Sequence, residues 1–120
     1  MAIIKKWVFC TFTVDRLHKW DEAKERKDLG VEFLSNLHRH LFHIKVKISV
    51  MHDNRDIEFI ALKRRLLAEA ATQWGEVVGS CEMMAEDVIS WLKTLYPYRN
   101  YIVEVSEDGE NGAIIEDLKC

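Results

Sequence analysis

The sequence predicts an α+β fold in which two helices cover one face of a four-stranded antiparallel sheet. Two observations carry this prediction. Four segments rich in β-branched and aromatic residues are bounded by turn-forming residues, and two segments with helical periodicity lie between the second and the third of them. The 120 residues contain no internal repeat and no linker-like stretch, so we expect one domain over residues 1–120.

The first two strands are predicted at residues 3–14 and 38–50. Aromatic and β-branched residues dominate the first segment. In the second, the even positions from His38 to Val50 are apolar or histidine, whereas the odd positions are mostly basic or polar. This period of two is typical of a strand with one buried face. Residues 15–36 carry many charges without periodicity, which predicts a long loop.

The remaining elements follow from periodicity and from residues that start or stop helices. A helix is predicted for residues 59–74, where apolar side chains recur every three or four positions. Ser80 is expected to cap a second helix, which ends before Pro97. The last two strands are predicted at residues 101–106 and 113–116, where a glycine-containing acidic turn joins them.

Composition and charge exclude several classes of protein. The net charge of −3 provides no positive field for a nucleic-acid polymer. No apolar run reaches the roughly 18 residues that a membrane span needs, and the first residues do not have the order of a signal peptide. The three cysteines, Cys10, Cys81 and Cys120, are odd in number and lack metal-site spacing. We therefore expect a cytoplasmic protein with reduced thiols.

A pair of histidines is the first candidate site. His38 and His40 lie two apart on a predicted strand, so both rings project from the same face. This geometry lets two imidazoles reach one metal ion, usually zinc. His18 in the long loop is the best third ligand, ahead of His43 and His52. The alternative interpretation is that the pair closes the end of the core and hydrogen-bonds to the backbone.

The second candidate is a site for a heterocyclic ring. Glu107 ends a predicted strand, and its carboxylate could accept two N–H groups from the edge of a guanine or pterin ring. Trp20 could stack on such a ring, and the N–H groups at Ser80 and Glu82 could receive an anionic group. The alternatives are a solvated hairpin turn, a tryptophan packed over the sheet edge, and a Glu82 that only favours the helix dipole.

Two further residues are included among the ligand-binding candidates. Cys81 belongs to the same predicted helix start, although no cysteine has a neighbouring histidine or second cysteine that would indicate a nucleophile or a redox pair. Arg39 begins a basic stripe with Lys45 and Lys47 on the odd positions of the second strand. We expect this stripe to be a solvated or subunit-facing surface of the sheet.

Four segments occur in a characteristic order: His-Arg-His-Leu-Phe (38–42), Glu-Phe-Ile-Ala-Leu-Lys (58–63), Ser-Cys-Glu-Met (80–83) and Val-Glu-Val-Ser-Glu-Asp (103–108). They resemble the His-Gly-His-x-Tyr, Asp-Phe-x-x-Leu-Lys, Pro-Thr-x-Glu-Asn and Val-x-Val-x-Glu-Thr motifs of the T-fold family of 6-pyruvoyl- and 6-carboxy-tetrahydropterin synthases. The resemblance spans nearly the whole chain, and the family has the same β-β-α-α-β-β order. It implies two zinc ligands in the first segment, a ring-anchoring Glu107, and a barrel formed by trimers or hexamers.

The chain also departs from the family pattern at three places. Leu34 stands where the synthases have a catalytic cysteine, four residues before the histidine pair. Residues 75–79 contain no counterpart of the family's Leu-Asp-His segment, whose histidine takes part in proton transfer. Arg16 occupies the position of the first zinc ligand in the Phe-x-Ala-Ala-His pattern, and His18 follows two residues later.

These features predict a small-molecule-binding protein without synthase chemistry. It would hold a purine, a pterin or a nucleotide, such as a sequestered signalling nucleotide, in pockets at the interfaces of a homo-oligomer. Loss of a nucleophile and its proton-transfer partner normally removes many orders of magnitude in rate. The alternative is a zinc-dependent lyase resembling the synthases, with His43, His52 or Asp53 as substitute acid and base. A third interpretation is a structural interaction protein without a small ligand.

Overall fold

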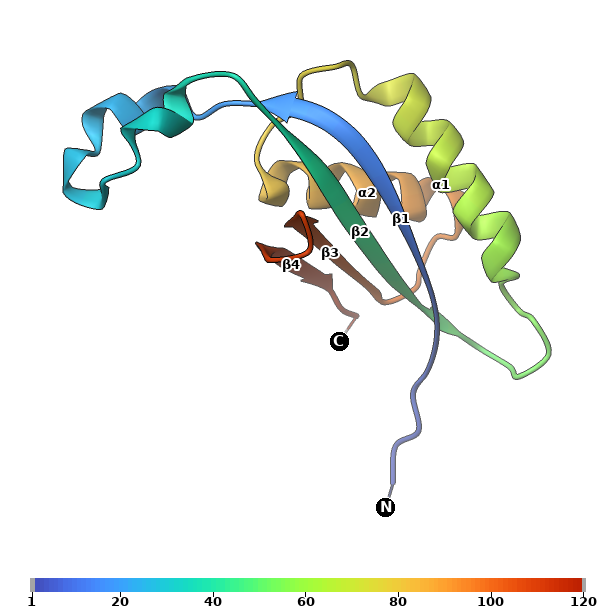
Figure 1. Cartoon of the computed structure of the whole chain (residues 1–120). Helices are drawn as coiled ribbons and strands as arrows, with labels where there is room; N and C mark the ends of the chain where they lie inside the picture. The colour runs from blue at the N-terminus through green and yellow to red at the C-terminus, as the bar shows by residue number, and fades with distance from the viewer. Residues whose placement is uncertain (1, 120) are drawn as a thin grey trace.

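The computed structural model describes residues 2–119, so Cys120 lies outside the described residues. Two helices pack on one face of a four-stranded antiparallel sheet whose strands lie side by side in chain order, which confirms the predicted α+β class (Figure 1). Within these residues, no helix has the length and apolar character needed to cross a membrane.

Three strands end later than the sequence indicated, most clearly the first, whereas the second has the predicted bounds of 38–50. The elements are β1 (Lys6–His18), three short 3-10 helices (Asp21–Glu25, Lys27–Leu29 and Glu32–Ser35), β2 (His38–Val50), α1 (Phe59–Gln73), α2 (Cys81–Leu95), β3 (Tyr101–Glu107) and β4 (Asn111–Asp117). The predicted bounds of 3–14 for the first strand were wrong, because pairing with all 13 residues of β2 continues the strand through its charged end. The connection after it is correspondingly shorter, and the 3-10 helices occupy it.

The core lies between the helices and one face of the sheet. The even positions of β1 and β2 point into it, including Phe12, Phe42 and Ile44, and so do the odd positions of β3. The helices contribute one stripe each, with Leu66 of α1 and Leu92 of α2 fully buried. The predicted half-buried character of residues 38–50 is therefore confirmed.

The connection between the two helices runs beside the end of β1. Leu17 donates its N–H to the carbonyl of Glu76 at 2.8 Å, and Val78 donates to the carbonyl of Leu17 at 2.8 Å. These two backbone hydrogen bonds hold residues 76–78 alongside the end of β1. As a result, Gly79 and the first turn of α2 lie next to His18.

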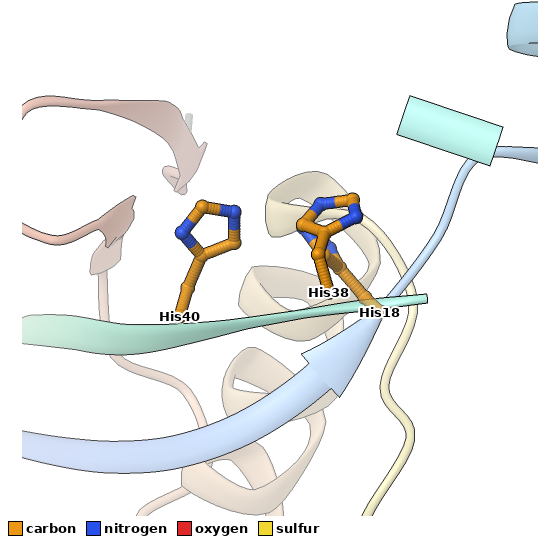
Figure 2. Close-up of side chains that lie close together, drawn as sticks. All are labelled: His18, His38 and His40. Atoms are coloured by element: carbon orange, nitrogen blue, oxygen red, sulfur yellow. The ribbon is translucent and has the colours of Figure 1, made fainter. Parts of the chain in front are cut away.

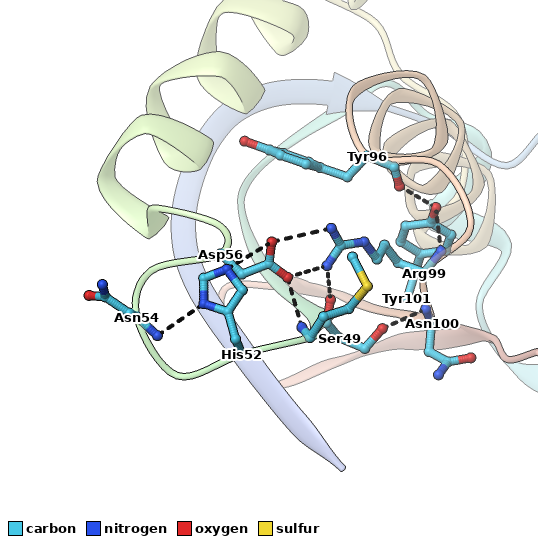
Figure 3. A network of polar contacts seen from close by, with 9 residues as sticks. Ser49, His52, Asn54, Asp56, Tyr96, Arg99, Asn100 and Tyr101 are labelled. Atoms are coloured by element: carbon cyan, nitrogen blue, oxygen red, sulfur yellow. Dashed lines mark hydrogen bonds and ion pairs between the residues drawn. The ribbon is translucent and has the colours of Figure 1, made fainter.

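A partly buried ion pair holds the opposite end of β2 (Figure 3). The Arg99 guanidinium donates to Asp56 at 2.7 Å and to the carbonyl of Ser49 at 3.1 Å. Asp56 also accepts the backbone N–H of Met51 at 2.7 Å. The side chains of Asp56 and Arg99 are only 12% and 13% exposed. The pair therefore fastens the loop after β2 to the loop before β3.

This ion pair predicts acid sensitivity. The Arg99 hydrogen bond, followed by that from Met51, lowers the pKa of Asp56 from 3.8 to about 2. Because the folded state has the lower pKa, the stabilisation is present above about pH 4 and is lost as the pH falls towards about 2. We expect Asp56→Asn to lower the melting temperature at pH 7, and the difference from the parent to shrink by pH 2. Glu110→Gln, an exposed change at a residue without an ion pair among the described residues, serves as the control in thermal unfolding from pH 7 to 2, and a gap that is constant with pH would contradict the prediction.

Candidate metal centre and ligand cleft

Three histidines from two neighbouring strands come together at one end of the sheet (Figure 2). His38 and His40 lie on the same face of β2 as Phe42, as predicted, and their ring centroids are 5.0 Å apart. His18 was expected in a loop, and that placement was wrong: it is the last residue of β1 and pairs directly with His38. Its ring centroid lies 4.6 Å from that of His38 and 5.2 Å from that of His40.

Each of the three rings is held through its Nδ1 atom. His18 Nδ1 lies 3.3 Å from the carbonyl of Gly79, and His38 Nδ1 lies 2.7 Å from the carbonyl of Asn36. His40 Nδ1 lies 2.8 Å from Oδ2 of Asp108. Carbonyl and carboxylate oxygens accept hydrogen bonds, so each Nδ1 carries the proton and each Nε2 has a free lone pair. Such outer hydrogen bonds are the usual support of metal-binding histidines.

The three rings bring one nitrogen each into the same small space. One ring nitrogen from each histidine lies within 4.8 Å of those of the other two. Among the described residues, Nε2 of His18 and Nε2 of His38 are buried without a hydrogen-bond partner. Buried polar atoms are normally satisfied, and a cation would satisfy these two. The three histidines could therefore hold a metal ion, and three protein ligands would leave a coordination position open.

The charge state of His18 suits this role. Burial is the largest effect on its pKa and lowers it from 6.5, and the neighbouring His38 and His40 act in the same direction. The carbonyl of Gly79 and the charge of Glu107 oppose the shift without reversing it. The imidazole is therefore neutral near pH 7, which is the form that binds metals.

Glu107 lies beside the histidines at the end of β3. Its Oε2 atom is 2.9 Å from His18 Nε2, and its Oε1 atom is 3.7 Å from His40 Nε2. The shorter contact does not have hydrogen-bond geometry, since His18 Nε2 remains without a hydrogen-bond partner. The carboxylate side chain is 29% exposed. It can therefore reach both the space between the imidazoles and a molecule in the adjoining cleft.

A cleft of about 310 Å³ opens beside the histidines. Three of the predicted ligand-binding residues line it, namely Trp20, Ser80 and Glu107. Leu34, which stands where the synthases have their cysteine, is also in its wall. The full lining consists of His18, Lys19, Trp20, Asp21, Glu22, Leu34, His38, Gly79, Ser80, Met83 and Glu107. The structure thus brings the predicted ring-binding residues next to the predicted metal ligands.

The start of α2 forms another wall of this region. Ser80 caps the helix by accepting the N–H of Met83 at 3.1 Å, which confirms the predicted N-cap. Cys81 and Glu82 line a neighbouring hollow of about 220 Å³ that shares Ser80 and Glu107 with the cleft. Burial, with the charges of Glu107 and Glu82, raises the pKa of Cys81 to about 11. Its thiol is therefore protonated at neutral pH and is a weak nucleophile.

Other predicted residues lie away from the cleft. Arg39 is exposed, forms an ion pair with Asp15 at 2.7 Å and lines a separate depression. His43 occupies an exposed odd position of β2, between the inward-facing Phe42 and Ile44. His52 and Asp53 follow the far end of β2. None of these four residues lines the cleft.

Sequence reasoning missed the residues that orient the rings. Gly79 and Asn36 act through backbone carbonyls, which leave no signature in a sequence. Asp108 acts through its side chain but was treated only as part of a turn. The available signal was an Asp-Gly pair directly after a strand, where a carboxylate can turn back onto the neighbouring strand.

No protein-family model and no curated protein sequence matches this chain. The resemblance to the T-fold family therefore rests on the four sequence segments and on the order of the elements. What the site can do follows from its own geometry.

The metal site leads to a direct prediction. Purified protein should bind about one zinc ion per chain and melt at a higher temperature when zinc is added, because the ion binds only the folded state. Replacing His38 and His40 together by alanine should abolish both effects. His43→Ala is the matched control, since it removes an exposed histidine of the same strand and should change neither. Metal analysis below a tenth of an equivalent, with no thermal shift, would contradict the site.

Proposed function

We propose that this chain is a T-fold protein that binds zinc through His18, His38 and His40 and holds a small heterocyclic ligand in the adjoining cleft. The observation that carries the proposal is the set of three Nδ1 contacts, which leave three Nε2 atoms free beside the cleft. Three imidazoles suit zinc. The β-β-α-α-β-β order supports the assignment to the T-fold.

The cleft suits one flat ring system of the purine or pterin type. Its volume of about 310 Å³ lies at the lower end of the usual range for ligand pockets, about 300–1,000 Å³. Trp20 offers an indole ring for stacking, and the Glu107 carboxylate can accept two N–H groups from the ring edge. These two residues define a ligand that is aromatic on its faces and carries hydrogen-bond donors along one edge.

The charges of the lining favour an uncharged ring over a polyphosphate. Asp21, Glu22 and Glu107 contribute three carboxylates to the cleft. Among the described residues of its lining, Lys19 is the only lysine or arginine, and it already lies 3.3 Å from Asp21. The phosphates of a nucleotide would therefore have to lie next to the proposed zinc ion or outside the cleft, and the side-chain charges of the lining favour a free base or a pterin over a signalling dinucleotide.

Binding without turnover is favoured because the acid and base residues considered for a lyase lie outside the cleft. Proton-transfer chemistry on the ligand needs an acid and a base within hydrogen-bond reach. Of the substitutes considered for a lyase, His43 is exposed at an odd position of β2, and His52 and Asp53 follow the far end of that strand. Cys81 is held in its protonated form. We therefore favour a sequestering protein over an enzyme.

A zinc-dependent lyase is the second candidate, and one observation favours it. A metal bound by three histidines keeps an open position, as catalytic zinc sites do. The test is incubation of the zinc-loaded protein with reduced pterins, followed by chromatography of the mixture. Unchanged pterin recovered in complex with the protein supports sequestration, whereas a new product supports the lyase.

The ligand pockets are proposed to lie at the interfaces of a homo-oligomer. β1 and β4 are the two edges of the sheet, and open edges tend to pair with other chains. The face without helices also exposes Phe9, Leu41 and Ile114. Closing several sheets into one barrel would pair the edges and enclose these side chains.

Assembly can be measured directly. We expect sedimentation equilibrium at micromolar concentration to show a trimer or a hexamer, because closure needs several copies of a four-stranded sheet. A lysine at Ile114 of edge strand β4 should lower the assembly state by repulsion and desolvation at the interface. The control is Leu67→Lys, which changes an exposed apolar residue of α1 away from the sheet edges and should leave the assembly state unchanged. A 14 kDa species at all concentrations would contradict the barrel.

The role of Glu107 is tested by Glu107→Gln in the zinc-loaded protein. The amide keeps the shape but offers one donor in place of an acceptor, and each charge-assisted bond contributes about 1.5–3 kcal/mol. We expect the affinity for guanine or pterin to fall by more than about tenfold with the melting temperature nearly unchanged, and comparison at equal zinc content separates ring binding from an effect on the metal. Glu110→Gln, an exposed change in the same turn, should bind like the parent. Equal affinities of parent and Glu107→Gln in calorimetry would refute this role.

A further inference from the structure

Asp108 connects the β3–β4 turn to the histidine centre through three contacts. Its Oδ2 atom lies 2.8 Å from His40 Nδ1, and its Oδ1 atom accepts the N–H of Leu41 at 3.1 Å. Its own N–H donates to the carbonyl of Leu41 at 2.8 Å. The carboxylate is thus held against β2 beside His40, and each of its two oxygens contacts a different hydrogen-bonding group.

The turn itself does not require a carboxylate. Asp108 has a φ of 57° and Gly109 a φ of 75°, so both residues adopt the left-handed conformation. Asparagine tolerates this conformation as well as aspartate does, and Asn-Gly is at least as favourable a turn sequence. The identity of residue 108 as an acid therefore needs an explanation other than turn formation.

That explanation lies in the two donors that the side chain faces. Leu41 presents a backbone N–H, which can only donate. His40 Nδ1 can either donate or accept, depending on which ring nitrogen carries the proton. A carboxylate accepts from both groups and therefore selects the form of His40 that is protonated at Nδ1. An amide would give its single oxygen to Leu41 and present its NH₂ group to Nδ1, which selects the opposite form.

We propose that Asp108 is a positioning residue that holds His40 with its Nε2 lone pair free and thereby sets the affinity of the centre for zinc. The other two rings are held by the backbone carbonyls of Gly79 and Asn36. Among the three ring contacts, that of Asp108 is the one that comes from a side chain, so a substitution can remove it. This inference rests on the proposed zinc site.

The decisive variant is Asp108→Asn, which keeps the turn and reverses the polarity of the group that faces His40. In the metal-free protein, nitrogen NMR of the imidazole should show His40 protonated at Nδ1 in the parent and at Nε2 in the variant. A His40→Ala spectrum identifies the signal. Zinc titration should show an affinity lower by about 10- to 100-fold, the usual cost of losing an outer partner. The melting temperature of the metal-free protein should stay within a few degrees of the parent.

Two further variants separate positioning from folding. Asp108→Gly removes the carboxylate and adopts a positive φ without strain, so it should also lose zinc affinity while the fold is retained. Glu110→Gln should change neither the His40 signal nor the affinity. A parent His40 protonated at Nε2, or an Asp108→Asn variant with parental spectrum and affinity, would overturn the inference. A parent that binds no zinc would refute the proposed function, whereas the NMR measurement would still decide the tautomer.

Discussion

The register between β1 and β2 is the constraint on which the rest of the molecule depends. Thirteen consecutive pairs run from Lys6 opposite Val50 to His18 opposite His38. Because side chains alternate between faces, a slip of one residue would turn the buried side chains of β1 outward and move His18 to the far face. The apolar side chains of the middle pairs therefore fix the geometry of a polar site at the end of the ladder. The same register between β1 and β2 therefore determines both the packing of the core and the geometry of the histidine site.

The outer hydrogen bonds reconcile two interpretations of the histidines that looked opposed in the sequence. In the first interpretation, the histidines close the end of the core and hydrogen-bond to the backbone. In the second, they are metal ligands. His18 and His38 do bond to backbone carbonyls through Nδ1, as the first interpretation requires. The same bonds leave their buried Nε2 atoms unsatisfied, as the second requires. An uncompensated buried nitrogen is costly, which is why we favour the metal site.

The period of two in residues 38–50 was enough to predict the shared face of His38 and His40, and Ser80 marked the start of α2 correctly. The position of His18 could not be read in the same way. Charged residues break the pattern after Val14, and the strand continues because of long-range pairing with β2 and with residues 76–78. The carbonyls that orient two of the rings are equally invisible in a sequence. Local patterns thus predicted the elements, while tertiary contacts completed the site.

The segment between β1 and β2 extends away from the sheet as a separate lobe, shown in blue and cyan in Figure 1. Its base is closed by one backbone bond, from Trp20 N–H to the carbonyl of Leu34 at 2.7 Å, and Ala23 is buried within it. Trp20 and Leu34 face the cleft, whereas the 3-10 helices contribute nothing to the core cluster beneath the sheet. During evolution this lobe can therefore be lengthened, shortened or exchanged at little cost to folding. A change in the lobe would alter two walls of the cleft, at Trp20 and Leu34, and leave the three histidines on their strands.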